Sequence, residues 1–232
     1  MPTAPRSSLP LPLIRDARDD DADQLIALIG GVFAEYPGCI LDVDGEIPEL
    51  RAIATAFRDQ GGRFWVAEDA ARVVACVGYK PKLSGVAPPE GRVGGAAPSW
   101  AAGPAGRVGG AAPSWAAGPA GRVGGAAPSW AAGPAGPFTG PAVPVELCKL
   151  YVAREGRRRG LGSALCGLVE KEARARNAAY VELWSDTRFL DAHRLYEGRG
   201  YVRGPEIRPL HDRSNSLEYH FRLDLADRGA GD

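Results

Sequence analysis

The chain has 232 residues, enough for one large domain or two small ones, and its 28 basic and 28 acidic residues balance to a net charge of zero. Nucleic-acid-binding proteins gather Lys and Arg on one face, but the densest basic run here is Arg157-Arg158-Arg159, which is too short to follow a phosphate backbone. We therefore expect no nucleic-acid partner.

The cysteines favour a reducing compartment. Cys39, Cys76, Cys148 and Cys166 form no C-x-x-C pair and lie at no metal-ligand spacing from histidines, so no metal site is expected. The first twelve residues lack the apolar block of a signal peptide, and no run is long and apolar enough to cross a membrane. We expect a cytoplasmic protein with no membrane partner.

The N-terminal part predicts a flexible tail at 1–8, followed by one domain over 9–225. A strand is expected at 9–14, then a helix capped by Asp21 and Gln24 with apolar residues at helical spacing up to Tyr36. Pro48 starts a second helix that ends at Gly61-Gly62. The runs 64–68 and 73–79 predict a hairpin of two strands.

A perfect repeat interrupts the domain. The unit GRVGGAAPSWAAGPA occurs three times, at 91–105, 106–120 and 121–135, within a Gly/Pro/Ala-rich insertion over 86–143. One tryptophan per unit buries too little apolar surface to offset the ordering entropy. The composition favours a disordered insertion made by tandem duplication, and a proline-rich interaction tether is the alternative.

The C-terminal part alternates strands and helices. A strand at 145–152 leads into a basic, glycine-containing loop and a helix whose buried stripe runs from Leu161 to Ala173. A strand at 179–184, a short helix around 192–196 and two strands within 201–223 follow, before a flexible tail at 226–232. The pattern predicts a single α/β domain.

The loop between the strand at 145–152 and the next helix carries the strongest chemical signal. It reads Arg157-Arg158-Arg159-Gly160-Leu161-Gly162-Ser163. Glycines let the backbone approach an anion, and the following helix start offers unpaired N–H groups, so the loop can cradle a pyrophosphate. A plain strand-to-helix turn with solvated arginines is an equally open alternative on spacing alone.

Two motifs together resemble a known family. Arg157, Gly160 and Gly162 match the Arg-x-x-Gly-x-Gly coenzyme A signature of the GNAT superfamily of N-acetyltransferases, and the segment 192–201 (AHRLYEGRGY) is similar to that family's second motif. The resemblance covers 145–223 well and 12–79 loosely. It implies a mixed, mostly antiparallel sheet flanked by helices, which splays between 146–152 and 179–184 to admit coenzyme A.

The resemblance also implies an activity, the transfer of an acetyl group from acetyl-CoA to a primary amine of a small molecule or peptide. Tyr196 matches the general acid of the family, and a core tyrosine is the alternative reading. Glu146 stands where family members often carry an activating glutamate, against an ordinary strand glutamate. The implied cofactor-binding residues are Leu150, Tyr151, Val152, Arg157, Arg158, Arg159, Gly160, Leu161, Gly162 and Ser163.

Acceptor choice in this family usually comes from the first helices and last strands, which directs attention to Phe33 and Tyr36. The chain departs from the pattern at Phe189, where many members have an asparagine that holds coenzyme A; Asp186, Thr187 or Arg188 are candidates to replace that contact. His193 is expected on the solvent side of its helix. A non-catalytic acyl-CoA-binding regulatory domain and an interaction protein built on the repeats are the rival functions, and a homodimer is left open.

Overall fold

The structure is a computed structural model that describes residues 12–82 and 143–225. The predictions for the tails at 1–8 and 226–232, and for the repeats at 91–135, concern residues outside these ranges.

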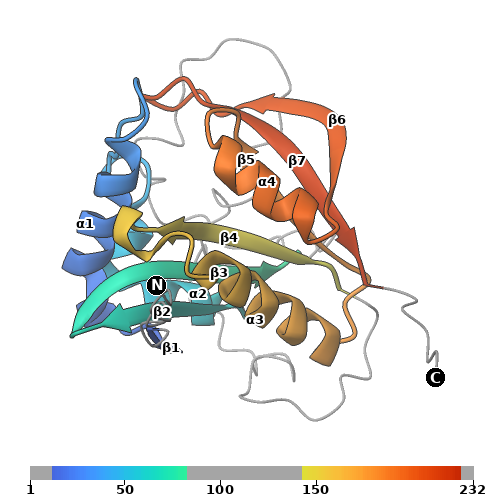
Figure 1. The fold of residues 1–232 in the computed structure, drawn as a ribbon, viewed down its shortest axis with the longest axis horizontal. Coiled ribbons are helices and arrows are strands. Elements are labelled where there is room, and N and C mark those ends of the chain that lie inside the picture. The colour runs from blue at the N-terminus through green and yellow to red at the C-terminus, as the bar shows by residue number, and fades with distance from the viewer. Residues whose placement is uncertain (1–11, 83–142, 226–232) are drawn as a thin grey trace, which may run out of the picture.

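One seven-stranded sheet organises the described chain (Figure 1). Its spatial order is β1-β2-β3-β4-β5-β7-β6, and every neighbouring pair is antiparallel except the parallel pair β4–β5. The strands are β1 Leu13–Asp16, β2 Arg63–Asp69, β3 Arg72–Pro81, β4 Val145–Val152, β5 Tyr180–Asp186, β6 Val202–Pro209 and β7 Leu217–Asp224. The predicted mixed, mostly antiparallel sheet is confirmed.

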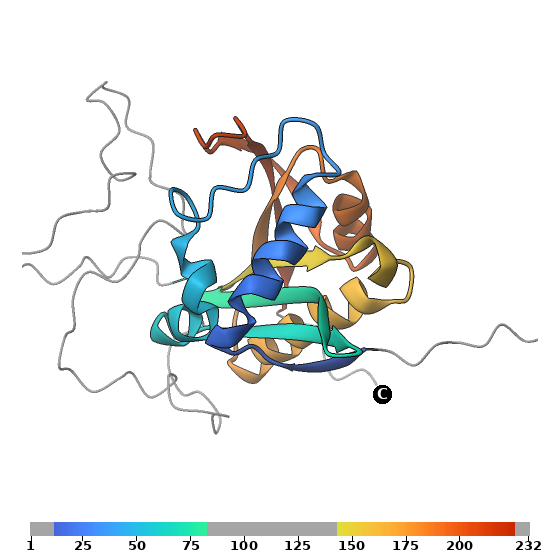
Figure 2. The same ribbon diagram turned by 90° about the vertical axis from the view of Figure 1, so that its left-hand side faces the viewer.

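Helices cover the sheet on both faces. They are α1 Ala22–Phe33, α2 Ile53–Asp59, α3 Leu161–Ala175 and α4 Leu190–Gly198, with short 3-10 turns η1 Asp19–Asp21, η2 Pro48–Ala52 and η6 Arg154–Gly156. Alternate residues of β2 enter two separate cores: Phe64 and Val66 pack with α1 and α2, whereas Trp65 and Ala67 pack on the α3 side. Figure 2 shows α1 crossing in front of the central strands.

The sheet opens between β4 and β5. These strands pair only at Val145↔Val181 and Glu146↔Glu182, and they diverge beyond that point. The ladder between β3 and β4 shifts register between Cys76 and Gly78, and Lys149 has a φ of 54°, so β4 bends away from β5. The predicted splay is confirmed, and Figure 1 shows β4 standing apart from β5 and β7.

The first helix begins differently from the prediction. The Asp21 side chain accepts hydrogen bonds from Arg15 and from the Arg18 backbone, and Gln24 Oε1 accepts from the Val73 N–H of β3 at 2.8 Å. The expected reciprocal capping pair of Asp21 and Gln24 is therefore absent, because both side chains serve tertiary contacts. The long predicted helix starts as η1 and continues as α1.

Candidate active site

The strand–loop–helix from β4 to α3 forms one wall of a cleft of ≈ 750 Å³, here called the cradle cleft. Every predicted cofactor-binding residue except Arg159 lines it: Leu150, Tyr151, Val152, Arg157, Arg158, Gly160, Leu161, Gly162 and Ser163. The Arg159 guanidinium instead lies 3.0 Å from the Asp69 carboxylate, outside this cleft.

Two glycines of the loop are required for different structural reasons. Gly160 precedes the first turn of α3 with a φ of 79°, a left-handed conformation that glycine adopts without strain. At Gly162 a Cβ atom would lie 3.1 Å from Leu195 Cδ2, so any side chain would press on α4. The loop therefore turns tightly and exposes the backbone N–H groups at the start of α3 to the cleft.

Arg157 ties three elements together at the edge of the cradle cleft. Its Nε donates to the Val152 carbonyl at 3.0 Å, and its Nη atoms donate to the two Glu35 carboxylate oxygens at 2.7 Å each. This two-pronged ion pair fixes the end of α1 beside the end of β4. The charge of Arg157 is thus partly balanced by Glu35.

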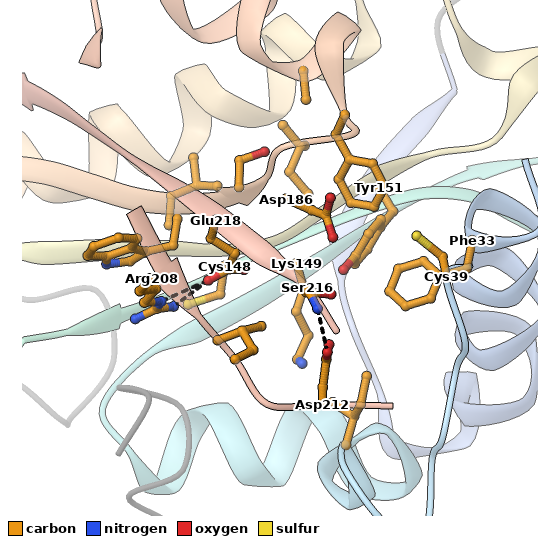
Figure 3. A pocket seen from close by; sticks show the side chains of 18 of the residues that line it. Phe33, Cys39, Cys148, Lys149, Tyr151, Asp186, Arg208, Asp212, Ser216 and Glu218 are labelled. Atoms are coloured by element: carbon orange, nitrogen blue, oxygen red, sulfur yellow. Dashed lines mark hydrogen bonds and ion pairs between the residues drawn. The ribbon is translucent and has the colours of Figure 1, made fainter. Parts of the chain in front are cut away.

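A second, smaller hollow of ≈ 170 Å³, here called the inner cavity, adjoins the cradle cleft (Figure 3). The two share four lining residues: Leu150, Tyr151, Phe189 and Ala192. Three of the residues predicted for catalysis or acceptor binding line the inner cavity, namely Phe33, Glu146 and Tyr196, whereas Tyr36 lines the cradle cleft. The cradle residues and the residues predicted for catalysis and acceptor binding, which are far apart in the sequence, thus line two adjoining hollows.

Tyr196 is held in apolar surroundings on α4. Its side chain is 4 % exposed, and its ring centroid lies 5.5 Å from that of Phe221 and 5.8 Å from that of Tyr201. Burial raises the pKa of Tyr196 well above its usual value of 10, so the hydroxyl stays protonated through neutral and alkaline pH.

Glu146 is the second residue of β4, at the last rung before the sheet opens. It is 8 % exposed and stands between Lys80 of β3 and Glu182 of β5 in the ladder. A carboxylate at this place is within the inner cavity wall and close to the opening toward the cradle cleft.

The sequence analysis missed the carboxylates that β5 and β7 contribute. Glu218 accepts from Arg208 Nε at 2.8 Å, and burial raises its pKa while Arg208 opposes that rise. Asp186 lines the cavity at the end of β5. The alternation of Glu218, His220 and Arg222 along β7 was visible in the sequence, but only the pairing of β5 with β7 brings that face to the cavity.

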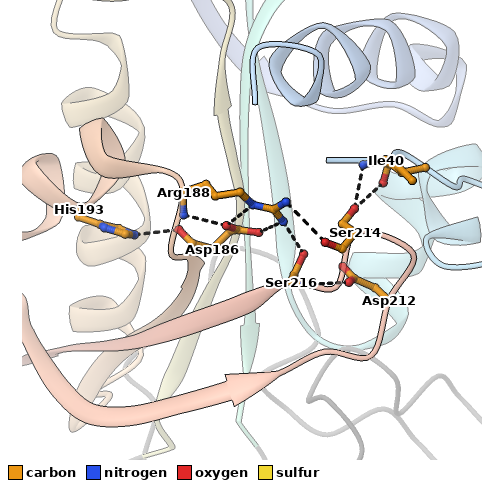
Figure 4. A network of polar contacts seen from close by, with 7 residues as sticks. All are labelled: Ile40, Asp186, Arg188, His193, Asp212, Ser214 and Ser216. Atoms are coloured by element: carbon orange, nitrogen blue, oxygen red, sulfur yellow. Dashed lines mark hydrogen bonds and ion pairs between the residues drawn. The ribbon is translucent and has the colours of Figure 1, made fainter. Parts of the chain in front are cut away.

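Phe189, at the position where the resemblance implies an asparagine, forms an aromatic wall. Its ring centroid lies 4.7 Å from that of Tyr36 and 6.1 Å from that of Phe33. Asp186 and Arg188 pair with each other, Nη2 to Oδ2 at 2.6 Å, and point toward the loop before β7 (Figure 4). Neither lines the cradle cleft, so neither supplies the missing amide contact there.

The expected solvent position of His193 was wrong. The ring is 6 % exposed, its Nε2 lies 3.0 Å from the Asp186 carbonyl oxygen, and it packs against Tyr219 and Phe221. The helical spacing did not identify this side because α4 is covered by β7 as well as by α3. Burial lowers the pKa of His193 below its usual value of 6.5.

Within residues 12–82 and 143–225, no group of three or more His, Cys, Asp or Glu side chains could hold a metal ion. None of the helices described in these two ranges has the length and apolar character that a membrane span needs.

Comparison with known proteins agrees with the resemblance that the two motifs indicate. Residues 131–201 match the model of the acetyltransferase (GNAT) family, a stretch that contains both the cradle loop and α4. No curated protein matches the chain in sequence. The family match and the fold support an acetyl-CoA-dependent acyltransferase.

Solved GNAT structures share the fold at low sequence identity. A GNAT acetyltransferase from Staphylococcus aureus Mu50 superposes with a TM-score of 0.58 at 14% identity, covering 92% of this chain and 98% of that one. A ribosomal-protein-alanine N-acetyltransferase from Brucella melitensis gives 0.54 at 16%, covering 92% and 99%. An acetyltransferase structure from Salmonella typhimurium with acetyl-CoA gives 0.54 at 14%, covering 97% and 99%.

Proposed function

We propose that this protein transfers an acetyl group from acetyl-CoA to a primary amine of a small molecule or peptide. The observation that carries the proposal is the meeting of the cradle cleft and the inner cavity at the opening between β4 and β5. The cleft suits the pyrophosphate and pantetheine of the donor, and the cavity suits the acceptor. Both substrates then meet beside Tyr196.

The edge of β4 supplies the electrostatic help that acyl transfer needs. Beyond Glu146 this edge has no ladder partner in β5, so backbone N–H groups near Leu150 and Val152 are available to the thioester oxygen. Donors aimed at the oxygen that gains negative charge are usually the largest contribution to such a reaction. The amine nitrogen attacks the carbonyl carbon, and the carbon–sulfur bond breaks when the tetrahedral intermediate collapses.

Tyr196 is the proposed general acid for the departing thiolate. Its hydroxyl keeps its proton at neutral pH because burial raises its pKa. The ordinary pKa of a thiol is about 8.5, and the same apolar surroundings raise it, which narrows the gap to the higher pKa of the Tyr196 hydroxyl that supplies the proton.

Glu146 is the proposed base, acting directly or through water, because a lysine-like ammonium with a pKa of about 10.4 must lose a proton before it attacks. Glu146→Gln removes that acceptor. We expect the rate to fall mainly at neutral and lower pH, where most of the amine is protonated, and to approach the wild-type rate at alkaline pH. Identical pH–rate profiles of kcat/KM for the two proteins would leave Glu146 as a strand residue only.

The proposal is tested by acetyl-CoA consumption, followed as thiol release, with and without a panel of amines. Amine-dependent thiol release together with a mass increase of one acetyl group on the amine supports transfer. Calorimetric binding of acetyl-CoA without turnover of any amine would instead favour a non-catalytic acyl-CoA-binding regulatory domain.

A further inference from the structure

Two loops that line the inner cavity are joined to each other by hydrogen bonds. The first loop, residues 34–47, connects α1 to η2, and the second loop, residues 210–216, connects β6 to β7. Both contribute to the cavity wall, through residues such as Ile40 and Glu46 from the first and Leu210 and Asp212 from the second. An acceptor bound in the cavity therefore lies beneath both loops.

Hydrogen bonds staple the two loops at three places. Ser214 Oγ accepts from the Ile40 N–H at 2.8 Å and donates to the Ile40 carbonyl at 3.2 Å (Figure 4). The Arg213 N–H donates to Glu46 at 2.6 Å, and the Arg213 guanidinium donates to Asp42 at 3.0 Å. The loops thus form a continuous roof over the cavity.

A half-buried ion pair also holds the second loop. Arg188 is paired with Asp186 and donates to the Ser216 hydroxyl at 3.0 Å, and its Nη1 lies 3.5 Å from the Ser214 carbonyl. Asp186, Ser214 and Ser216 are all buried. Opening the roof would leave buried polar groups without partners, which is costly, so this roof is a fixed wall and not a freely moving lid.

The roofed cavity is small. Its ≈ 170 Å³ is close to the volume of about 150 Å³ in which a benzene-sized molecule fits. A polypeptide acceptor must continue outward from the residue that is acetylated, and a path between these two loops would need an open groove there. The staples at Ser214 and Arg213 close that route.

The cavity wall also has an acidic balance. Its carboxylates are Glu46, Glu146, Asp186, Asp212 and Glu218, and its cationic side chains are Lys80, Lys149 and Arg208. Two of those cations already have acidic partners, because Lys149 pairs with Glu49 at 2.9 Å and Arg208 pairs with Glu218 at 2.8 Å. Asp186 is balanced by Arg188, and the remaining carboxylates still outnumber the remaining cations. An acceptor that carries a carboxylate of its own would add repulsion, whereas an amine without one complements the wall.

We propose that the acceptor is a small primary amine without a negative charge, and that the roof made by residues 34–47 and 210–216 excludes polypeptide chains. This inference rests on the proposed transfer to an amine. It narrows the acceptor class to molecules that fit entirely beneath the stapled loops, such as short alkyl diamines or arylalkylamines.

The test compares kcat/KM for thiol release by the full chain with four kinds of acceptor. These are 1,4-diaminobutane, phenethylamine, a free amino acid, and two pentapeptides whose only amine is the N-terminus or a lysine. We expect the two carboxylate-free amines to exceed both peptides and the amino acid by at least about a hundredfold.

A variant with a weakened roof tests whether the loops themselves exclude peptides, as opposed to a preference for small amines that arises elsewhere in the site. Arg213→Ala with Ser214→Ala removes two of the staples. Arg222→Ala is the control, because it removes an exposed pair with Asp224 and a ring contact with Tyr180, both outside the roof. We expect the double variant to gain peptide turnover by about tenfold or more relative to diaminobutane, and the control to keep the wild-type ratio.

Peptide turnover equal to that of the small amines in the wild type would overturn this inference while leaving acetyl transfer intact. A higher kcat/KM for the amino acid than for diaminobutane would overturn the inference that the acceptor carries no negative charge. Thiol release with none of the acceptors, in a protein that binds acetyl-CoA, would overturn the transfer reaction itself.

Discussion

At the scale of single residues, Tyr196 is the most sharply testable position. Tyr196→Phe keeps the ring packing against Phe221 and removes the proton, so turnover should fall by about 10²–10⁴-fold while acetyl-CoA affinity stays nearly unchanged. The measurements are steady-state kinetics with the best acceptor and calorimetric titration of acetyl-CoA.

Tyr201 offers a matched control for that substitution. It is equally buried and touches Tyr196, and its hydroxyl has no hydrogen-bond partner among the described residues. Tyr201→Phe should therefore leave turnover unchanged and leave stability equal or slightly higher. An equal loss of turnover in both variants would point to packing, not to proton donation by Tyr196.

His193 gives the domain a dependence of stability on pH. Its folded-state pKa lies below the unfolded value of about 6.5, so the unfolded chain binds a proton that the folded chain refuses, and stability falls as pH drops below about 6.5. The charged groups facing it are Glu197 on α4, Asp186 on β5 and Arg203 on β6, and burial outweighs the two carboxylates.

His193→Gln can keep the contact with the Asp186 carbonyl without titrating. We expect its melting temperature to fall less between pH 7.5 and pH 5.5 than that of the wild type, because one proton-linked contribution is gone. Thermal melts of both proteins across this range measure the difference. Parallel curves would show that the buried ring does not titrate in that window.

The sequence predicted which residues lie along the two hollows better than it predicted their surroundings. The resemblance directed attention to Tyr196 and Glu146, and the strand–loop–helix pattern indicated the cradle residues, because local backbone geometry fixes such a turn. It missed Glu218 and misplaced His193, because their surroundings depend on how β7 pairs with β5. Phe189 was identified as a departure, but its stacking on Tyr36 depends on the fold.

At the scale of elements, the loop before α3 makes a specific prediction about anion binding. Gly160 has a left-handed φ of 79°, and a Cβ atom there would meet nothing within 4 Å. Asp and Asn tolerate this conformation comparably well and have nearly the same shape. Gly160→Asp and Gly160→Asn therefore share the backbone cost and differ in the added negative charge.

We expect Gly160→Asp to reduce coenzyme A affinity by at least about tenfold more than Gly160→Asn, because the carboxylate stands where a phosphate would bind. Calorimetry with coenzyme A in the two folded variants measures the difference. Equal affinities would remove the pyrophosphate from this end of α3.

The elements themselves were largely predictable, and the exceptions have physical causes. The predicted strand at 145–152 and the predicted helix from Leu161 agree with β4 and α3. In this part of the chain the hydrophobic periodicity and the glycines of the turn indicate the same boundaries. The first strand was expected at 9–14, but β1 is Leu13–Asp16, whose register is set by pairing with β2. The hydrophobic pattern of an edge strand does not indicate which strand it pairs with or in which register, so its ends are hard to predict from sequence.

At the scale of the whole molecule, the sheet separates two cores and places the cradle cleft and the inner cavity at one opening. One core, with α1 and α2, and the other, with α3 and α4, pack on opposite faces of the sheet. The gap opens beyond the two residue pairs that join β4 to β5. The roof over the inner cavity belongs to the ends of α1 and β6, far from the cradle loop in sequence. On the proposed function, donor and acceptor are therefore recognised by different segments of the chain.

The repeats enter the fold at a defined place. β3 and β4 are hairpin neighbours whose pairing reaches Pro81↔Val145, and the Lys82 N–H donates to the Pro144 carbonyl at 2.7 Å. Lys82 also forms an ion pair with the buried Glu182. The two ends of the insertion are therefore held together by residues that the structure describes.

This geometry predicts the effect of removing residues 91–135. The composition predicts a flexible loop, and shortening the connection about fourfold lowers its closure cost by about 1.2 kcal/mol, which corresponds to a melting temperature higher by about 2–5 °C. The cradle lies at the opposite end of β4, roughly 23 Å from Val145, so acetyl-CoA affinity should not change. Lys80 and Glu146 lie near the insertion and line the inner cavity, so only the KM of the acceptor is free to shift. Thermal melts and acetyl-CoA titrations of the full-length and deleted proteins measure both effects; loss of cooperative unfolding in the deleted protein would show that the repeats are part of the folded core.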